Sequence, residues 1–207
     1  MQNVLADMAV EVEAALALGL RVARAMDNVD DPGEAALARI GTAVAKYWNT
    51  KRCPSLVAEA LECHGGLGYV EESIMPRLYR EAPLNSIWEG SGNVMGLDVM
   101  RAMGRDAEAI PAVMTELEKA RGNHPNLDRA IDDLRDELTD LDGLEGRMRT
   151  VTEMMALTLQ GALLTSQGDS AVADAFCASR LAPRYRGAFG TLPKGLDLDT
   201  VISRALP

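Results

Sequence analysis

The chain has 207 residues, of which 47% are hydrophobic, and it carries a net charge of −10 at pH 7. This length corresponds to one domain or slightly more, and the apolar content is sufficient for a sizeable core. The acidic balance argues against a general nucleic-acid binder and against binding to anionic membranes. Ala, Leu and Met supply most of the apolar volume, and long β-branched runs with a period of two are missing, so we expect an all-α fold.

Cysteine usage and the N-terminal segment bear on the compartment. Cys53, Cys63 and Cys177 are an odd number without paired spacing, which is typical of free thiols in a reducing environment. The apolar N-terminal run is interrupted by charged residues such as Asp7 and Arg21, and no basic segment precedes it. This pattern argues against a signal peptide or a membrane span. We therefore expect a soluble, cytoplasmic protein.

Hydrophobic periodicity predicts a helix over residues 3–26, with Leu5, Val12, Leu16 and Leu20 on its apolar face. A turn is expected at 27–33, then a helix over 34–50 and another that Pro54 opens and that ends near residue 63. After the interrupted stretch 60–92, helices are predicted for residues 92–103, 107–120, 126–141, 143–166, 170–181 and 198–205. The charges within 126–141 are most simply a solvated helix face with ion pairs.

Glycine and proline interrupt the helical period within residues 60–92. The Gly65-Gly66 pair and Gly68 allow tight turns and close approach of a ligand to the backbone, but they equally fit a helix end closed by glycine. Pro76 and Pro83 predict an extended segment between them.

That segment carries two arginines, Arg77 and Arg80, which lie three residues apart. They could clamp a phosphate or carboxylate, or they could pair with Glu71 and Glu81.

Glu89 is the candidate catalytic carboxylate. It follows Trp88 and precedes Gly90, a setting in which desolvation raises a carboxyl pKa, so that the group can act as a general base towards a weakly acidic carbon proton. A simpler alternative is that the Glu89 carboxylate interacts favourably with the positive end of the dipole of the next helix.

The two histidines do not indicate a site. His64 with the nearby cysteines does not match zinc spacing, so no metal site is predicted. With only His64 and His124 present, no Ser-His-Asp set can be argued either.

Three short motifs occur in a fixed order and spacing. They are Gly65-Gly66-Leu67-Gly68-Tyr69, Arg77-Leu78-Tyr79-Arg80-Glu81 and Ile87-Trp88-Glu89-Gly90-Ser91. Together they resemble the C-terminal signature of the acyl-CoA dehydrogenase family. The run from Met75 to Glu81, the run from Trp88 to Asn93 and the tail resemble in particular its AidB-type branch, which belongs to the adaptive response to DNA alkylation.

The resemblance implies a fold and a set of functional residues. Residues 1–104 would be the helical bundle of an acyl-CoA dehydrogenase C-terminal domain without its first helix, and residues 105–207 an AidB-type helical extension. The family binds FAD and forms homotetramers that are dimers of dimers. The resemblance also implies roles for individual residues. Glu89 would be the base that removes the α-proton of acyl-CoA. The residues expected to contact FAD are Gly65, Gly66, Ser91 and Asn93, and those expected to support the substrate or the loop are Trp88, Gly90 and Arg80. In the AidB branch the C-terminal segment is linked to DNA, and the residues expected to contact DNA here are Arg180, Arg184, Arg186 and Lys194.

The sequence also departs from the family pattern. Glu62 stands where the family has Gln, Ser91 replaces Thr, and Val94-Met95-Gly96 stands where an Arg is usual. The other family domains are missing, so we expect an isolated fragment that neither holds FAD nor turns over substrate. Three functions follow as hypotheses: the C-terminal fragment of an FAD-dependent acyl-CoA dehydrogenase, a flavin-containing DNA-binding protein of the alkylation response, or an inactive helical oligomerisation module.

Overall fold

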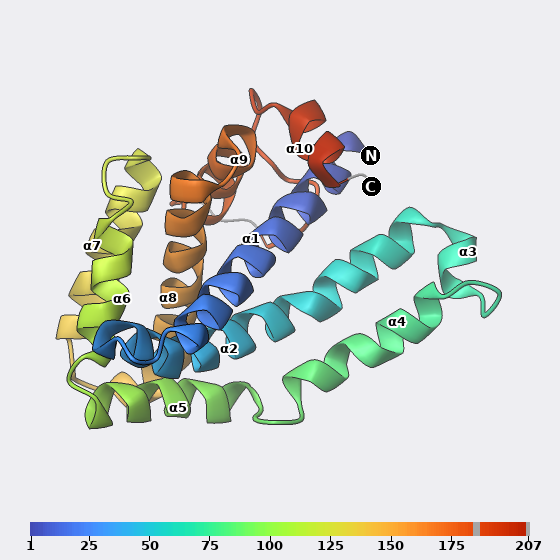
Figure 1. The fold of residues 1–207 in the computed structure, drawn as a ribbon. Helices are drawn as coiled ribbons and strands as arrows, with labels where there is room; N and C mark the ends of the chain where they lie inside the picture. Colours follow the sequence, from blue (N-terminus) through green and yellow to red (C-terminus); the bar gives the residue numbers. More distant parts are fainter. Residues whose placement is uncertain (184–186, 206–207) are drawn as a thin grey trace.

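A computed structural model describes residues 1–183 and 187–205, which form ten α-helices and one 3-10 helix without any strand (Figure 1). The predicted all-α fold is confirmed. The elements are α1 (Gln2–Asp27), α2 (Pro32–Cys63), α3 (Gly66–Tyr69), α4 (Met75–Glu81), the 3-10 helix η1 (Ala82–Ser86), α5 (Gly92–Arg105), α6 (Ala109–Glu118), α7 (Pro125–Thr139), α8 (Leu144–Gln167), α9 (Ser170–Arg180) and α10 (Leu198–Ala205).

The helix α2 is continuous through Pro54, so the expected break between residues 50 and 54 is wrong. A proline in a helix interior removes one hydrogen bond and costs about 3 kcal/mol. The surrounding packing holds the helix together across that defect. The half before Pro54 buries Ile40, Val44 and Trp48 in the core, and α2 also packs against α4 and η1.

The segment that was expected to be extended is helical instead. Pro76 lies in the first turn of α4 and Pro83 in the first turn of η1. The missing N–H of a proline is not needed at these positions, so proline starts a helix there rather than preventing one. The result is an arm in which α4 and η1 run back along α2, with α3 at the far end (Figure 1).

One hydrophobic core serves both halves of the chain. The helix α8 packs against α1, α2, α5, α6, α7 and α9. The core cluster contains Ile40 and Leu18 from the first hundred residues together with Met155 and Phe176 from the second. The helices α8, α9 and α10 therefore pack directly onto α1, and α6 and α8 pack onto α2, while the boundary at residue 104 stays a prediction.

The buried face of α1 is not the one that the sequence pattern selected. Ala6, Val10, Ala14, Leu18 and Val22 are buried at four-residue spacing. In contrast, Leu5, Val12, Leu16 and Leu20 are exposed, Leu20 by 61%. The absence of a side chain at Gly41 of α2 lets the two helices approach closely, since a Cβ there would lie 3.1 Å from Val22 Cγ2 of α1. This helix therefore carries two apolar faces, and the larger residues lie on the outer one.

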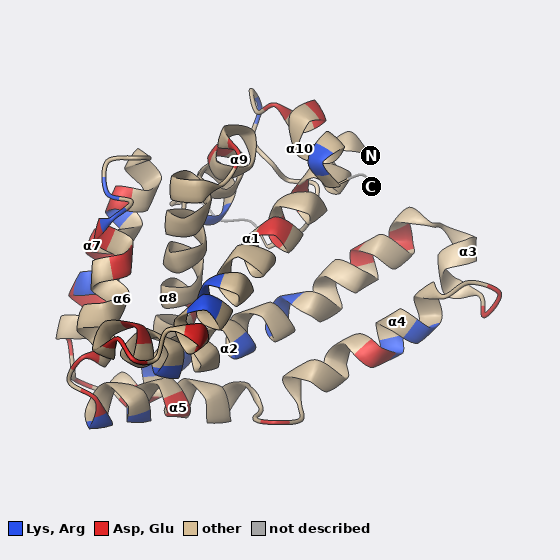
Figure 2. Cartoon of the chain, viewed as in Figure 1, with Lys and Arg blue, Asp and Glu red and all other residues tan. Residues whose placement is uncertain are grey.

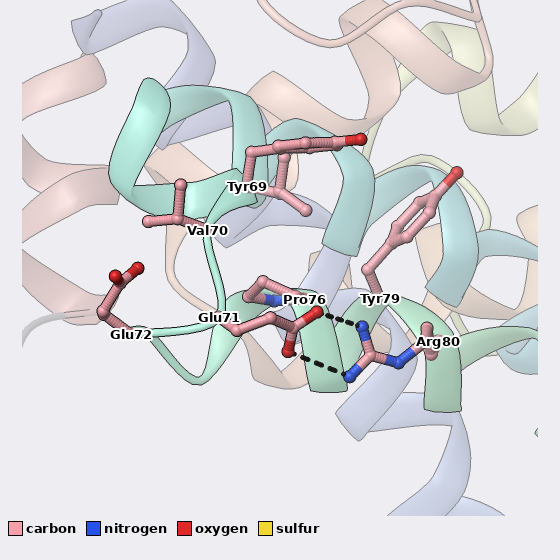
Figure 3. A pocket seen from close by; sticks show the side chains of 8 residues that line it. Tyr69, Val70, Glu71, Glu72, Pro76, Tyr79 and Arg80 are labelled. Atoms are coloured by element: carbon pink, nitrogen blue, oxygen red, sulfur yellow. Dashed lines mark hydrogen bonds and ion pairs between the residues drawn. The ribbon is translucent and has the colours of Figure 1, made fainter.

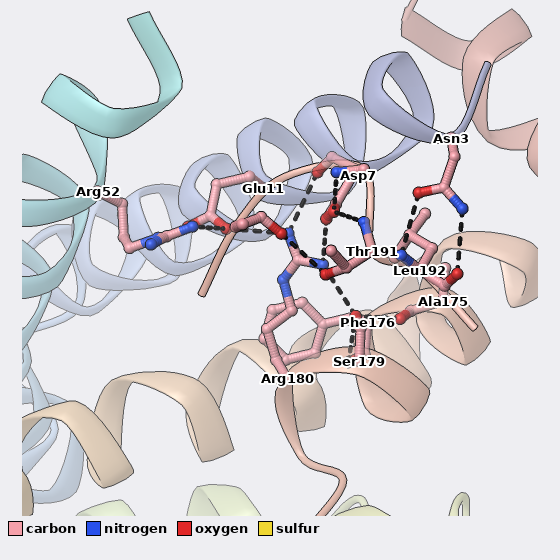
Figure 4. A network of polar contacts seen from close by, with 12 residues as sticks. Asn3, Asp7, Glu11, Arg52, Ala175, Phe176, Ser179, Arg180, Thr191 and Leu192 are labelled. Atoms are coloured by element: carbon pink, nitrogen blue, oxygen red, sulfur yellow. Dashed lines mark hydrogen bonds and ion pairs between the residues drawn. The ribbon is translucent and has the colours of Figure 1, made fainter. Parts of the chain in front are cut away.

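Buried ion pairs fasten the C-terminal helices to α1 (Figure 4). Arg180 of α9 pairs with Asp7 and with Glu11, 3.1 Å from the Glu11 carboxylate, and Arg52 of α2 approaches Glu11 to 2.9 Å. Burial alone would raise the pKa of Glu11, but the hydrogen bond from Arg52 and the charges of Arg180 and Arg52 outweigh it and hold that pKa below its ordinary value.

Charged residues of both signs are concentrated on α7 (Figure 2). Arg135 pairs with both Glu118 and Asp132, and Arg129 with Asp133 at i,i+4. The prediction of a solvated helix face with ion pairs is confirmed. None of the described helices combines the length and hydrophobicity needed to cross a lipid bilayer.

Candidate functional site

The loop between η1 and α5 carries Glu89. Its backbone is in the left-handed region, with φ of +55° at Glu89 and +114° at Gly90. A residue other than glycine in such a conformation costs about 1–3 kcal/mol, so surrounding contacts must hold it. Glu89 is exposed and Trp88 is 56% exposed. The desolvation that was expected from Trp88 is therefore not provided by the described residues of this chain.

The residues after Glu89 begin α5. Ser91 is the N-cap residue, and its carbonyl accepts a hydrogen bond of 2.9 Å from the Met95 amide, while its side chain makes no cap hydrogen bond. Glu89 is thus not the capping residue of α5. Asn93 Oδ1 accepts from Arg149 Nη1 at 3.3 Å, and Arg149 comes from α8. The C-terminal half of the chain therefore contacts the segment that follows the candidate base.

The sequence reasoning missed two residues near this loop. Lys46 of α2 donates from Nζ to one carbonyl of η1 and to two carbonyls of the loop, and Arg149 Nε donates to Tyr47 Oη at 3.3 Å. The sequence could have pointed to Lys46, because a single cation between the apolar residues 43–45 and 47–48 indicates a charged group with a specific partner. Arg149 had none, since its partner Asn93 lies 56 residues away in the sequence.

The glycine turn closes the C-terminal end of α2. Gly65 has φ of +59°, and its amide donates to the Glu62 carbonyl at 2.9 Å. Gly68 is required for close packing, because a Cβ there would lie 2.0 Å from the Leu61 carbonyl oxygen. The interpretation of a helix end closed by glycine is confirmed. Nothing lies within 4 Å of the Cβ positions at Gly65 and Gly66, so the turn itself faces open space.

A groove of about 500 Å³ lies beside this turn, between α2, α3 and α4 (Figure 3). Tyr69, Tyr79 and Pro76 line it, and Arg80 closes one side. Arg80 binds Glu71 with two hydrogen bonds of 2.8 and 3.3 Å, and these hold the pKa of Glu71 below its ordinary value. Of the two alternatives for Arg80, the ion pair with Glu71 is the one formed here.

The predicted site residues fall into two groups that one chain does not bring together. Gly65 and Gly66 lie at the far end of the arm, whereas Glu89, Ser91 and Asn93 lie beyond its near end (Figure 1). The seven residues of α4 and the five of η1 separate them, which corresponds to about 20 Å of helix. Glu62, the residue that replaces the family Gln, is exposed beside the glycine turn.

Two of the residues suggested for DNA, Arg180 and Lys194, lie in the described part of the chain, where they line the same pocket. Arg180 is buried and committed to Asp7 and Glu11, so a phosphate contact would require breaking both pairs. Lys194 is exposed. Arg184 and Arg186 lie outside the described residues. Within the described part of the chain, no group of three His, Cys, Asp or Glu side chains could hold a metal ion.

A helical bundle with a Glu-Gly loop before one helix and a glycine turn at the end of another is the arrangement that the resemblance to the acyl-CoA dehydrogenase family led us to expect. The family model described as "Acyl-CoA dehydrogenase, C-terminal domain" matches residues 1–104, half of the chain. The chain therefore belongs to the acyl-CoA dehydrogenase family, and the resemblance read from the sequence is confirmed.

Relatives and solved structures agree with this assignment. The putative acyl-CoA dehydrogenase AidB of Escherichia coli is 40% identical over 184 residues, covering 89% of this chain and 34% of that protein. The short-chain specific acyl-CoA dehydrogenase of Sus scrofa mitochondria is 34% identical over 95 residues, covering 45% and 21%. The crystal structure of Caenorhabditis elegans ACDH-11 in complex with C11-CoA superposes with a TM-score of 0.74 at 26% identity, covering 81% of this chain and 34% of that one. The chain thus spans about a third or less of these relatives.

Proposed function

We propose that the chain supplies the C-terminal helical part of an FAD-dependent acyl-CoA dehydrogenase, an oxidoreductase that introduces a double bond between Cα and Cβ of an acyl-CoA. The observation that carries this proposal is the Glu89-Gly90 loop, which holds an exposed carboxylate in a left-handed backbone conformation at the start of α5. The C11-CoA bound by the nematode protein supports an acyl-CoA as the substrate class.

Glu89 would act as the base. None of the described residues donates a hydrogen bond to its carboxylate, so both oxygens are available to accept the α-proton. The loop supplies orientation, since Gly90 allows the turn that presents Glu89 and Trp88 offers an apolar surface beside it. A thioester α-proton is weakly acidic, and a fixed position relative to the carboxylate is therefore a large part of what the protein must provide.

The residues present fit FAD in part. Gly65 and Gly66 face open space and the Ser91 side chain is not used as a helix cap, so these groups, with Asn93, would hold the cofactor. FAD, when bound, accepts the hydride that leaves the β-carbon. Glu62 acts against binding, because its carboxylate lies beside the turn and repels phosphate.

The separation of the two groups of residues supports a site completed by a second copy of the chain. Gly65 and Ser91 lie at opposite ends of the arm, so each would serve a different active site in a homo-oligomer, here proposed as a dimer of dimers. Exposed apolar side chains on the arm, among them Leu67 and Tyr69, supply surface for such an association. Arg80 would support this part of the arm through its pair with Glu71.

The test is Glu89→Gln in the protein that carries this chain together with the rest of the family fold, assayed as acyl-CoA oxidation with an artificial electron acceptor. We expect a loss of about 10²–10⁴-fold in kcat, because the amide cannot accept the proton, with the flavin absorbance unchanged. Glu145→Gln, an exposed carboxylate in the first turn of α8, is the matched control. Full activity of Glu89→Gln would overturn the assignment of the base.

A further inference from the structure

The Lys46 side chain is fully engaged by the backbone around Glu89. Its Nζ lies 2.6 Å from the Asn85 carbonyl oxygen, 2.9 Å from that of Trp88 and 3.1 Å from that of Gly90. An ammonium group has three protons to donate, so these three bonds use all of them. Hydrogen bonds from a charged donor are stronger than neutral ones.

The three carbonyl oxygens that accept hydrogen bonds from Lys46 lie on both sides of Glu89 in the sequence. Trp88 contributes the carbonyl of the peptide that joins it to Glu89, and Gly90 contributes the carbonyl of the peptide that joins it to Ser91. The Asn85 carbonyl belongs to η1, whose last turn is closed by the Ile87 and Trp88 amides bonding to the Leu84 carbonyl. One ammonium group therefore joins the end of η1 to both sides of the residue that has φ of +55°.

We propose that Lys46 is a positioning residue for the candidate base: it holds the Glu89 backbone in its left-handed conformation and thereby sets where the carboxylate is presented. This inference rests on the proposed function of Glu89. Lys46 itself takes no part in proton transfer, because all its donors are directed at backbone carbonyls. It originates from the core helix α2, which supplies a rigid support for an otherwise exposed loop.

The consequence for the reaction is specific. Loss of the ammonium group leaves three carbonyls without their donor and lets the strained residue relax to a negative φ, which changes the direction of the carboxylate. We expect binding of the CoA moiety to be independent of that direction. Misplacement of a catalytic group by about 1 Å lowers the rate by up to about 10²-fold. We therefore expect removal of the Lys46 ammonium group to lower kcat and to leave KM nearly unchanged.

The first experiment uses this chain. Lys46→Met keeps the length of the side chain and removes its charge, and hydrogen–deuterium exchange read by mass spectrometry follows the peptide covering residues 84–90. We expect amide exchange in this peptide to become about 10-fold faster, because hydrogen bonds from a charged donor that stabilise it locally are lost. Exchange in α7 should stay unchanged. The control is Arg39→Met, which removes another cation that links α2 to α5, through its pair with Asp98. Equal exchange in the wild type and in Lys46→Met would overturn the proposal.

The second experiment measures acyl-CoA oxidation in the protein with the rest of the family fold. We expect Lys46→Met to lower kcat by about 10- to 100-fold with little change in KM, Lys46→Arg to restore part of the rate, and Arg39→Met to behave as the wild type. If Glu89→Gln is inactive but Lys46→Met has the wild-type kcat, the positioning role is refuted and the proposed function stands. If the wild type does not oxidise any acyl-CoA, the proposed function fails, and the exchange experiment still decides whether Lys46 holds the loop.

Discussion

Removing the Arg180 guanidinium tests how firmly the C-terminal helices are fastened to α1. In Arg180→Met the carboxylates of Asp7 and Glu11 stay buried without that partner. Breaking a buried ion pair by deleting one partner costs about 3–5 kcal/mol. Compensation remains here, because the Gly190 amide donates to Asp7 at 2.9 Å and Arg52 donates to Glu11 at 2.9 Å. We therefore expect the lower end, about 3 kcal/mol of unfolding free energy at pH 7.

The assay is urea unfolding followed by circular dichroism. Arg204→Met is the control, since Arg204 also pairs an outer helix with α1, through Glu13, but is 40% exposed, and such a pair is worth about 0–1 kcal/mol. The folded-state pKa of Glu11 is lowered from 4.5, so its ionised form adds stability above that pH, and the gain disappears as the pH falls through the folded value. The difference between the wild type and Arg180→Met should therefore shrink below about pH 4.5. A loss at pH 7 no larger than that of Arg204→Met would refute the reasoning.

Two further predictions concern the loop and the core. Gly90→Ala places a side chain at φ of +114° and 2.3 Å from Met95 Cε, and we expect a loss of about 1–3 kcal/mol in urea unfolding; an unchanged midpoint would show that the loop does not need this conformation. Phe176→Ala empties a position that is 1% exposed in the shared core, and we expect a loss of about 3–5 kcal/mol in one cooperative thermal transition. Two separate transitions in that variant would show that residues 1–104 and 105–205 unfold independently.

Most helices were predictable because their hydrophobic period and their ends are local properties. The helix α10 begins at residue 198 and ends at residue 205, as the sequence predicts, and α5 begins at Gly92 as predicted. The errors arose where tertiary packing outweighs a local rule. Pro54 is a valid helix start by sequence, but burial of the preceding residues and packing of α2 against α4 and η1 keep the helix intact. The sequence pattern places Pro76 in an extended segment, although a proline is compatible with the first turn of a helix, where it lies in α4.

The face of α1 and the contacts of the site could not be read locally. Large apolar residues such as Leu16 and Leu20 give the stronger sequence pattern, yet the described fold buries the alanine-rich face, because small residues allow close helix packing. The motif located Glu89, Gly90 and Ser91, which are neighbours in sequence. It could not locate Lys46, which meets them only after α2 and the arm fold back on each other.

The support of the Glu89 loop comes from both halves of the chain, which bears on what the C-terminal extension contributes. Lys46 of α2 fixes the loop before α5, while Arg149 of α8 bonds Asn93 in the first turn of α5 and stacks over the Tyr47 ring at 5.9 Å. The two helices α5 and α8 meet at Gly96, whose Cβ position is 3.6 Å from Met148. Displacing α8 would therefore move Asn93 and Tyr47 together, and Tyr47 adjoins Lys46 on α2. The helix α8 thus contacts the elements that flank the Glu89 loop, and we expect its loss to alter that loop even though it carries none of the family motifs.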